Sequence, residues 1–272
     1  MSQVVSQARD YYNSTDADEF YAKVWGGEDI HIGLYENPQD SIFDASRRTV
    51  EKMASLLQPG ASLKVLDIGS GYGGAARYIA KNFGCYVDCL NLSEAQNQRN
   101  REMTKSQGLD KQVRVFEGNF EDIPFGENSY DLVWSQDAIV HSGNRIKVVE
   151  EVYRVLKKDG RFLFTDIMQS DDCPKDVLQP IFDRICLDSM GSIGFYKQTA
   201  QDLGMEEVQI IELSQQLVNH YSQVLKDLSA KYEELVAFCT SDYLESQKRG
   251  LKQWIDAGEK GYITWGILQF KK

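Results

Sequence analysis

The stretch Leu66-Asp67-Ile68-Gly69-Ser70-Gly71-Tyr72-Gly73-Gly74 joins an apolar run to four closely spaced glycines. The apolar run is typical of a buried strand, and the residues from Tyr72 to Phe83 are expected to form a helix. Glycines between a strand and a helix permit positive φ angles and let the backbone approach a ligand closely. The stretch therefore predicts a strand, a ligand-binding loop and a helix in succession.

Strand and helix patterns alternate along the chain that follows this loop. The expected strands are Leu63–Ile68, Tyr86–Leu92, Val113–Glu117, Tyr130–Ser135 and Gly160–Asp166, and the expected helices are Tyr72–Phe83, Ser93–Gln107 and Arg145–Leu156. Such alternation predicts a mostly parallel sheet with helices on both faces, which is the Rossmann-like α/β class. Ligands of such sheets bind at the carboxyl ends of the strands.

We divide the chain into three parts of one domain. Residues 1–60 are expected to form an irregular aromatic lid and a helix over Ser41–Leu57 that ends at Pro59-Gly60. Residues 61–169 form the ligand-binding core. Residues 170–272 form a helical insertion on the substrate side and terminal strands that complete the sheet.

The last part contains three patterns. Residues 170–204 become amphipathic after an Asp-rich start, and Leu213–Ile255 has the apolar stripe of one or two helices. Tyr262–Phe270 is expected to be a strand.

Composition excludes several classes of protein. The chain has 272 residues, of which 42% are hydrophobic, and its net charge of −11 opposes binding to nucleic acids or anionic membranes. No apolar run approaches the ~20 residues of a membrane span, and the first residues lack signal-peptide features, so we expect a cytoplasmic protein. Five cysteines without C-x-x-C spacing predict neither a disulfide framework nor a metal site. The oligomeric state is left open.

The acid Asp67, two residues before Gly69, distinguishes this loop from the usual dinucleotide-binding form. An acid at the strand end can orient a cationic amino-acid group, which favours S-adenosylmethionine as the ligand. A dinucleotide site and a purely structural turn stay open as alternatives. Gly69 and Gly71 are predicted to line the cofactor site together with Asp67.

The ends of the next two strands offer contacts for ribose and adenine. Asn91 stands where a ribose-binding acid is expected, and its amide can both donate to and accept from hydroxyls. Asn119 would meet the exocyclic amine of adenine and Phe120 would lie against its ring, with a simple turn before Pro124 as the alternative. The other predicted cofactor contacts are Tyr12, Tyr21, His31, Leu92, Gln96 and Gln136.

The three histidines can be judged one by one. Methyl transfer from a sulfonium depends mainly on alignment, but an amine acceptor must first lose its proton. His141 follows the fourth strand at the ligand edge, so we predict that it accepts or steers this proton. His31 suits a cofactor contact and a packing role equally. His220 lies beside an apolar stripe, which is typical of a core histidine, with a pocket role as the alternative.

Aromatic and basic residues suggest a substrate site. Tyr12, Tyr21 and Trp25 lie close together in polar sequence and are predicted to form a lid, with ordinary packing as the alternative. Aromatic rings attract sulfonium and quaternary ammonium groups. Arg184 could bind a substrate carboxylate or pair with a neighbouring aspartate at the surface. The predicted substrate contacts are Tyr21, Trp25, Gln136, His141, Met168, Arg184 and His220, and the residue predicted to be catalytic is His141.

Motifs outside the glycine loop are far more specific than the loop. They are Tyr11-Tyr12-Asn13, Phe20-Tyr21, Trp25-Gly26-Gly27-Glu28-Asp29-Ile30-His31-Ile32-Gly33, Trp134-Ser135-Gln136-Asp137, His141-Ser142-Gly143-Asn144-Arg145, Leu187-Asp188-Ser189, Gln216-Leu217-Val218-Asn219-His220-Tyr221 and Trp265-Gly266-Ile267-Leu268. From about Tyr11 to Phe270 the chain resembles the sarcosine/dimethylglycine N-methyltransferases.

This resemblance implies a class I methyltransferase fold, S-adenosylmethionine as cofactor, and conversion of sarcosine to dimethylglycine and of dimethylglycine to glycine betaine. A more distant resemblance to phosphoethanolamine methyltransferases implies a catalytic pair of Tyr12 and His141. Ile167 stands where the betaine-forming family usually has proline. The alternatives are a phosphobase methyltransferase, a methyltransferase for a larger isoprenoid or phenolic acceptor, and a non-catalytic protein that binds the cofactor.

Overall fold

The computed structural model describes residues 3–25, 27–57, 63–185 and 187–272. The expected helix end at Pro59-Gly60, the expected boundary between residues 60 and 61, Gly26 and Cys186 lie outside these ranges.

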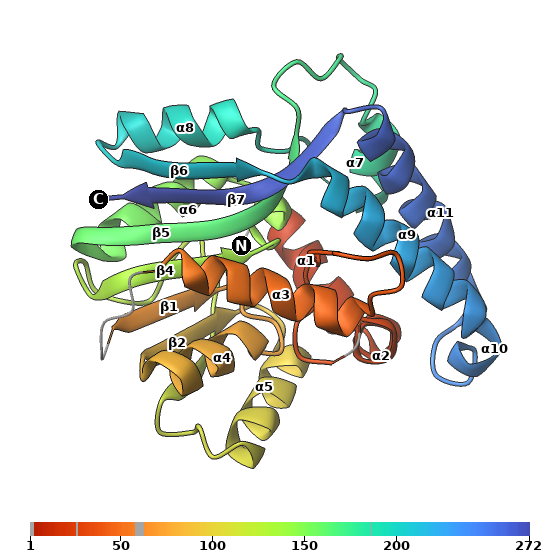
Figure 1. Cartoon of the computed structure of the whole chain (residues 1–272), viewed down its shortest axis with the longest axis horizontal. Helices are drawn as coiled ribbons and strands as arrows, with labels where there is room; N and C mark the ends of the chain where they lie inside the picture. Colours follow the sequence, from red (N-terminus) through yellow and green to blue (C-terminus); the bar gives the residue numbers. More distant parts are fainter. Residues whose placement is uncertain (1–2, 26, 58–62, 186) are drawn as a thin grey trace.

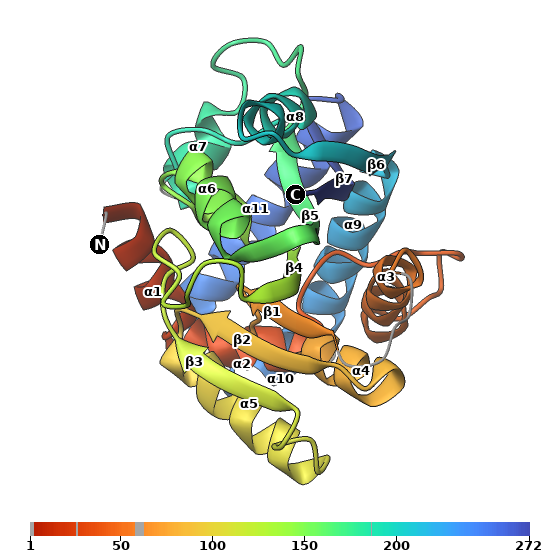
Figure 2. The same ribbon diagram turned by 90° about the vertical axis from the view of Figure 1, so that its left-hand side faces the viewer.

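A seven-stranded sheet runs through the described residues (Figures 1 and 2). Its strands are β1 (Lys64–Ile68), β2 (Tyr86–Asn91), β3 (Val113–Glu117), β4 (Tyr130–Gln136), β5 (Leu156–Gln169), β6 (Glu206–Glu212) and β7 (Ile263–Lys271). The order is β3-β2-β1-β4-β5-β7-β6, and β7 alone runs antiparallel to its neighbours β5 and β6. The order reverses between β1 and β4, so a crevice is expected at the carboxyl ends of these strands.

Helices cover both faces of the sheet. Helices α3 (Ile42–Ser55) and α4 (Gly74–Phe83) pack on one face, α6 (Arg145–Val155) and α8 (Ile193–Asp202) pack on the other, and α5 (Glu94–Ser106) runs beside β3 (Figure 2). Alternate residues of β5 enter the two cores, since Leu163 packs with α3 and α4 whereas Phe162 and Phe164 pack with α6 and α8. The predicted Rossmann-like class is confirmed.

The first part of the N-terminal segment forms two helices, so the expectation that it is irregular was wrong for residues 3–24. Helices α1 (Gln3–Tyr12) and α2 (Thr15–Val24) flank Ser14, whose Oγ accepts a hydrogen bond from the Ala17 N–H at 3.2 Å. Phe20 and Val24 are buried in a core shared with the C-terminal helices. Aromatic residues have modest intrinsic helix propensity, and here burial of one face outweighs it.

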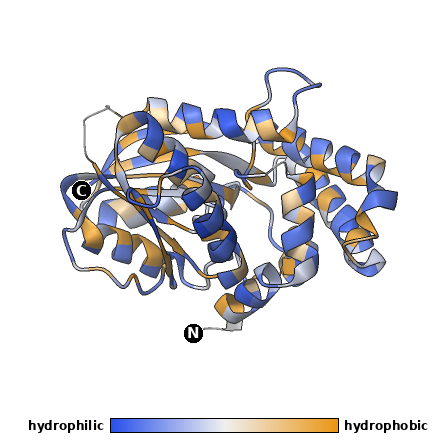
Figure 3. Ribbon diagram, turned by 90° about the horizontal axis from the view of Figure 1, so that it is seen from below, coloured by the Kyte–Doolittle hydropathy of each residue, from blue (hydrophilic) through white to orange (hydrophobic). Residues whose placement is uncertain are grey.

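The C-terminal part forms the other half of this core. It contains α7 (Gln179–Ile185), α9 (Ser214–Ala230), α10 (Tyr232–Leu235) and α11 (Ser241–Glu259), and each of the longer helices presents an apolar and a polar face (Figure 3). The sequence did not predict β6, because this edge strand is mostly exposed and rich in glutamate. No helix in the described ranges is both long and apolar enough to cross a membrane.

The glycine loop gives a test of the fold. Gly69 has φ +71°, and a Cβ atom there would collide with the Cβ of Ala138 after β4, whereas Gly84 has φ +67° and open space around it. We expect Gly84→Ala to cost about 1 kcal/mol of unfolding free energy through backbone strain, and Gly69→Ala to cost at least ~1 kcal/mol more through the collision. Urea denaturation of both variants measures the difference, and equal losses would contradict the close packing of the loop.

Candidate active site

Three adjoining cavities open at the carboxyl ends of the strands. We name them the adenosine-side cavity (about 90 Å³, between the glycine loop and Phe120), the acidic cavity (about 30 Å³, around Asp29 and Asp67) and the aromatic cavity (about 210 Å³, between Tyr21 and Arg184). Ile30 lines all three, and Tyr12, Asp137 and His141 line both the adenosine-side and the aromatic cavity. The three cavities therefore share walls and together make up the candidate site.

The adenosine-side cavity brings together most of the predicted cofactor contacts. Its walls include Gly69 and Gly71 after β1, Asn91 and Leu92 after β2, Gln96 of α5, Asn119 and Phe120 after β3, and Gln136 of β4. The Asn91 Nδ2 donates to the Gln96 Oε1 at 3.0 Å, which fixes the amide beside the cavity. Val5, Ala8 and Tyr12 of α1 close the opposite side, so the N-terminal helix covers this cavity.

The acidic cavity contains the predicted Asp67 and an acid that the sequence reading did not single out, Asp29. Burial raises the pKa of Asp67 from 3.8 to about 7, and burial, offset in part by the Arg47 guanidinium, raises the pKa of Asp29 to about 6. Among the described residues, His31 Nε2 and Gln136 Nε2 find no hydrogen-bond partner, although both are buried. His31 Nδ1 donates to the Ile32 carbonyl at 3.1 Å and burial lowers the pKa of the ring, so Nε2 is an acceptor, whereas Gln136 Nε2 is a donor. Acceptors and an unpaired donor thus face the same small space, which fits an amino-acid group with its ammonium and carboxylate.

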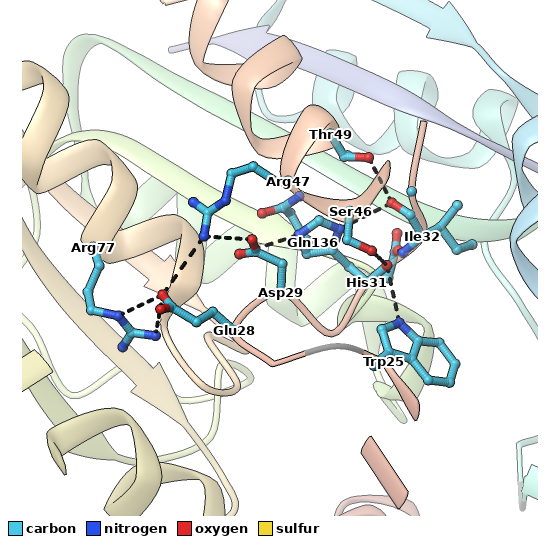
Figure 4. A network of polar contacts seen from close by, with 12 residues as sticks. Trp25, Glu28, Asp29, His31, Ile32, Ser46, Arg47, Thr49, Arg77 and Gln136 are labelled. Atoms are coloured by element: carbon cyan, nitrogen blue, oxygen red, sulfur yellow. Dashed lines mark hydrogen bonds and ion pairs between the residues drawn. The ribbon is translucent and has the colours of Figure 1, made fainter. Parts of the chain in front are cut away.

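A charged network holds the segment that contains Glu28 and Asp29 over the acidic cavity (Figure 4). The buried Arg77 of α4 donates to Glu28 Oε2 from Nε at 3.1 Å and from Nη2 at 3.0 Å, and Arg47 of α3 lies 2.8 Å from Asp29 Oδ2. Gly74 has no Cβ, and one would meet the Glu28 carbonyl at 2.7 Å. The segment therefore lies directly on the start of α4.

The aromatic cavity contains the predicted catalytic pair. The Tyr12 hydroxyl lies 3.0 Å from His141 Nε2, and the Tyr21 ring lies between those of Tyr12 and Trp25 at centroid distances of 5.8 and 4.9 Å. Burial, with the charges of Arg145 and Arg184, lowers the pKa of His141 to about 4, and burial raises the pKa of Tyr12. Both side chains are therefore neutral near pH 7.

Arg184 lines the same cavity without a counter-ion. No described carboxylate lies within ion-pair distance of it, and its buried Nε has no hydrogen-bond partner among the described residues. The alternative pairing with Asp183 or Asp188 is absent from the described part of the chain. An unpaired guanidinium beside a cavity is a site for an anion.

Three predicted substrate contacts do not line the aromatic cavity, and one of them, Gln136, lines the adenosine-side and acidic cavities instead. Met168 packs in the core below α6 and α8, whereas its neighbour Ile167 lines the aromatic cavity, because successive residues of β5 point to opposite faces. His220 lies behind Trp25, with ring centroids 5.1 Å apart, and its Nδ1 accepts the Gly33 N–H at 3.1 Å. The predicted contact of Met168 is corrected to Ile167, and His220 supports Trp25 from outside the cavity lining.

Asp137 is the main site residue that the sequence reading missed. It has φ +52° directly after β4 and lines two cavities. The signal for it was its place beside Gln136 at the carboxyl end of a central strand. The turn that follows is fixed by Asp166, whose Oδ1 accepts the Val140 N–H at 2.9 Å and so holds the short helix Ile139–His141.

Comparison with known proteins agrees with this geometry. Residues 66–164 match the family model described as a methyltransferase domain. Together with the sheet order, the glycine loop and the acidic cavity beside it, this match defines a class I methyltransferase with S-adenosylmethionine as its cofactor.

Similar proteins narrow the class to a family. The chain is 55% identical to the sarcosine/dimethylglycine N-methyltransferase of Aphanothece halophytica, over 99% of this chain and 98% of that one. It is 52% identical to the protein of the same name from Halorhodospira halochloris, over 99% and 97%. A solved structure from Galdieria sulphuraria, a candidate sarcosine dimethylglycine methyltransferase, is 44% identical with a TM-score of 0.92 over 96% of this chain and 98% of that one. The chain belongs to the sarcosine/dimethylglycine N-methyltransferases.

The buried acids predict how cofactor binding depends on pH. A carboxyl of pKa about 7 must ionise to hold an ammonium group, so we expect the affinity for S-adenosylmethionine to fall as the pH is lowered from 8 to 6. Asp67→Asn should weaken binding roughly tenfold at pH 8, the size of one charge-assisted hydrogen bond, and flatten the pH dependence. Calorimetry measures both, with Asp131→Asn at the other end of the sheet as control.

Although Asp67→Asn should weaken cofactor binding at pH 8, it should raise the stability of the cofactor-free protein at that pH. Without cofactor, the folded protein keeps a proton on Asp67 that the unfolded chain releases above about pH 4, so stability from this group is lost as the pH rises through about 7. Thermal denaturation at pH 8 and pH 5 should show Asp67→Asn gaining stability relative to the native protein at pH 8. A lower thermal stability of Asp67→Asn at pH 8 would contradict the inference that the ionised Asp67 carboxylate is buried at a cost in stability.

Proposed function

We propose that this enzyme transfers methyl groups from S-adenosylmethionine to sarcosine and to dimethylglycine and forms glycine betaine. One observation carries the proposal. The neutral Tyr12–His141 pair lies where the adenosine-side and aromatic cavities meet, and the unpaired Arg184 lines the same aromatic cavity. The names of the similar proteins support the same acceptors.

The cofactor is held by residues from the ends of β1 to β4. Asn91 and Gln96 face the ribose, with Leu92 beside them, and Asn119 and Phe120 face the adenine. Asp67, Asp29 and the acceptor nitrogen His31 Nε2 would receive the ammonium group, and Gln136 Nε2 would donate to the carboxylate, which gives partners to atoms that otherwise have none. When bound, S-adenosylmethionine supplies a methyl carbon on a positively charged sulfur that the acceptor nitrogen displaces.

The acceptor is held at both ends. Arg184 binds its carboxylate through charge-assisted hydrogen bonds. The rings of Tyr12, Tyr21 and Trp25 surround the amine, and their faces favour the increasing positive charge of the methylated nitrogen. An acceptor without a carboxylate leaves Arg184 unpaired, so the site selects amino acids over simple amines.

The acceptor nitrogen must lose its proton before it can react. An aliphatic amine has a pKa of roughly 10 in water, and the buried cavity lowers it. Neutral His141 and the Tyr12 hydroxyl accept and steer the proton that leaves. The charge of Arg184 lowers the pKa of His141, so a bound carboxylate that offsets this charge makes His141 a stronger base when the acceptor is present.

Product analysis tests the proposed reaction. We expect methylation of sarcosine and dimethylglycine, with S-adenosylhomocysteine formed in equal amount, and much slower turnover of phosphoethanolamine. Mass spectrometry of each reaction identifies the products. Preference for phosphoethanolamine, or cofactor binding without turnover of any small amine, would refute the proposal.

Variants of the pair test the proposed proton transfer. His141→Ala and Tyr12→Phe should lower kcat by about 100-fold or more, the usual contribution of a general acid or base, while the Kd for the cofactor changes less. Tyr243→Phe is a matched control, because its hydroxyl lies 3.0 Å from that of Tyr11 in the same aromatic cluster but outside the pair. Unchanged kcat of His141→Ala across the pH range would remove His141 from the mechanism.

A further inference from the structure

Gly250 is a glycine in the middle of a long, uninterrupted helix. It lies in α11, which spans Ser241–Glu259, and it is buried. Gln247, Leu251 and Trp254 on the same helix line the aromatic cavity, so Gly250 belongs to the helix face that borders the site. Glycine is poorly suited to a helix interior, and its presence there needs a reason outside the helix.

The guanidinium of Arg184 supplies that reason. A Cβ atom at position 250 would lie 2.5 Å from Arg184 Nη1 and 2.7 Å from its Nε. The Arg184 guanidinium, which extends from α7, therefore packs against the backbone of α11 in the space that a side chain at position 250 would occupy. By contrast, a Cβ atom at Gly258 of the same helix would meet the hydrocarbon of Val218 at 2.7 Å, which is ordinary close packing between helices.

Little else restrains Arg184. It makes no ion pair or hydrogen bond to the described residues that would fix its long side chain, and α7 is a helix of seven residues. Its place beside the cavity is therefore set mainly by the surfaces against which it packs. We propose that Gly250 is a positioning residue that, by lacking a side chain, places the Arg184 guanidinium where it receives the acceptor carboxylate.

This inference rests on the proposed function, in which Arg184 binds that carboxylate. It adds that substrate affinity depends on a residue that never touches the substrate. Because the colliding atoms belong to the flexible end of a side chain, an alanine at position 250 should displace Arg184 and leave the helix intact. Alanine also has the higher helix propensity, so the loss should appear in substrate binding and not in the fold.

Steady-state kinetics of the full-length enzyme test the inference. We expect Gly250→Ala to raise the KM for dimethylglycine roughly tenfold, the effect of losing one charge-assisted hydrogen bond. The kcat and the Kd for S-adenosylmethionine should change less than about twofold, and the midpoint of thermal denaturation should not fall. Gly258→Ala is the packing control, and it should lower that midpoint without raising KM.

The double variant Arg184→Ala/Gly250→Ala decides whether the effect passes through Arg184. We expect Arg184→Ala to raise KM and Gly250→Ala to add nothing in that background. An unchanged KM for Gly250→Ala, or a further rise in the double variant, would overturn the inference. If Gly250→Ala alone fails to fold, recovery of folding in the double variant supports the inference, and failure of both overturns it.

The same experiment separates this inference from the proposed function. A native enzyme that turns over neither sarcosine nor dimethylglycine refutes the proposed function. A native enzyme that is active, with Arg184→Ala showing an unchanged KM, refutes the role of Arg184. A raised KM for Arg184→Ala with an unchanged KM for Gly250→Ala refutes the positioning role alone.

Discussion

The carboxylate of Asp137 ties together the parts of the chain that surround the site. Its Oδ2 accepts the Ile32 N–H at 2.7 Å, and its Oδ1 accepts the Trp265 Nε1–H at 2.7 Å and the Thr165 hydroxyl at 2.8 Å. These donors come from the N-terminal segment, β7 and β5. Burial raises the pKa of Asp137 and these bonds oppose the rise, so the cost of a buried charge is offset by three donors that would otherwise lack a partner.

Much of the site follows from one rule of parallel sheets, that side chains at the carboxyl ends of strands converge. Asn91, Asn119, Gln136 and His141 could be predicted because each lies at the end of a strand whose pattern is clear or in the loop that follows it. Met168 was expected to contact the substrate because the strand was expected to end at Asp166, whereas β5 continues to Gln169 and its alternation turns Met168 into the core.

Features that depend on packing between distant segments could not be read from the chain. The helical form of α1 and α2 depends on a core shared with α9 and α11, and local propensity does not reveal that core. Asp29 is an ordinary polar residue in sequence and becomes a site residue only because its segment lies on the start of α4. The role of Gly250 likewise cannot be predicted from the sequence, because it depends on the packing of Arg184 from α7 against it.

The distribution of charge around the site explains how two zwitterions can be oriented for one reaction. Buried acids line the acidic cavity, where the proposal puts the amino-acid end of the cofactor, and an unpaired arginine lines the aromatic cavity. The reacting sulfonium and the protonated amine would repel each other if both met in a buried space. The neutral Tyr12–His141 pair and the carboxylate of Asp137 lie where they meet, so this part of the site favours the approach of a neutral amine to a cationic donor. In the proposed reaction, selection by Arg184 and removal of the proton at His141 are thus two consequences of the same arrangement of charges.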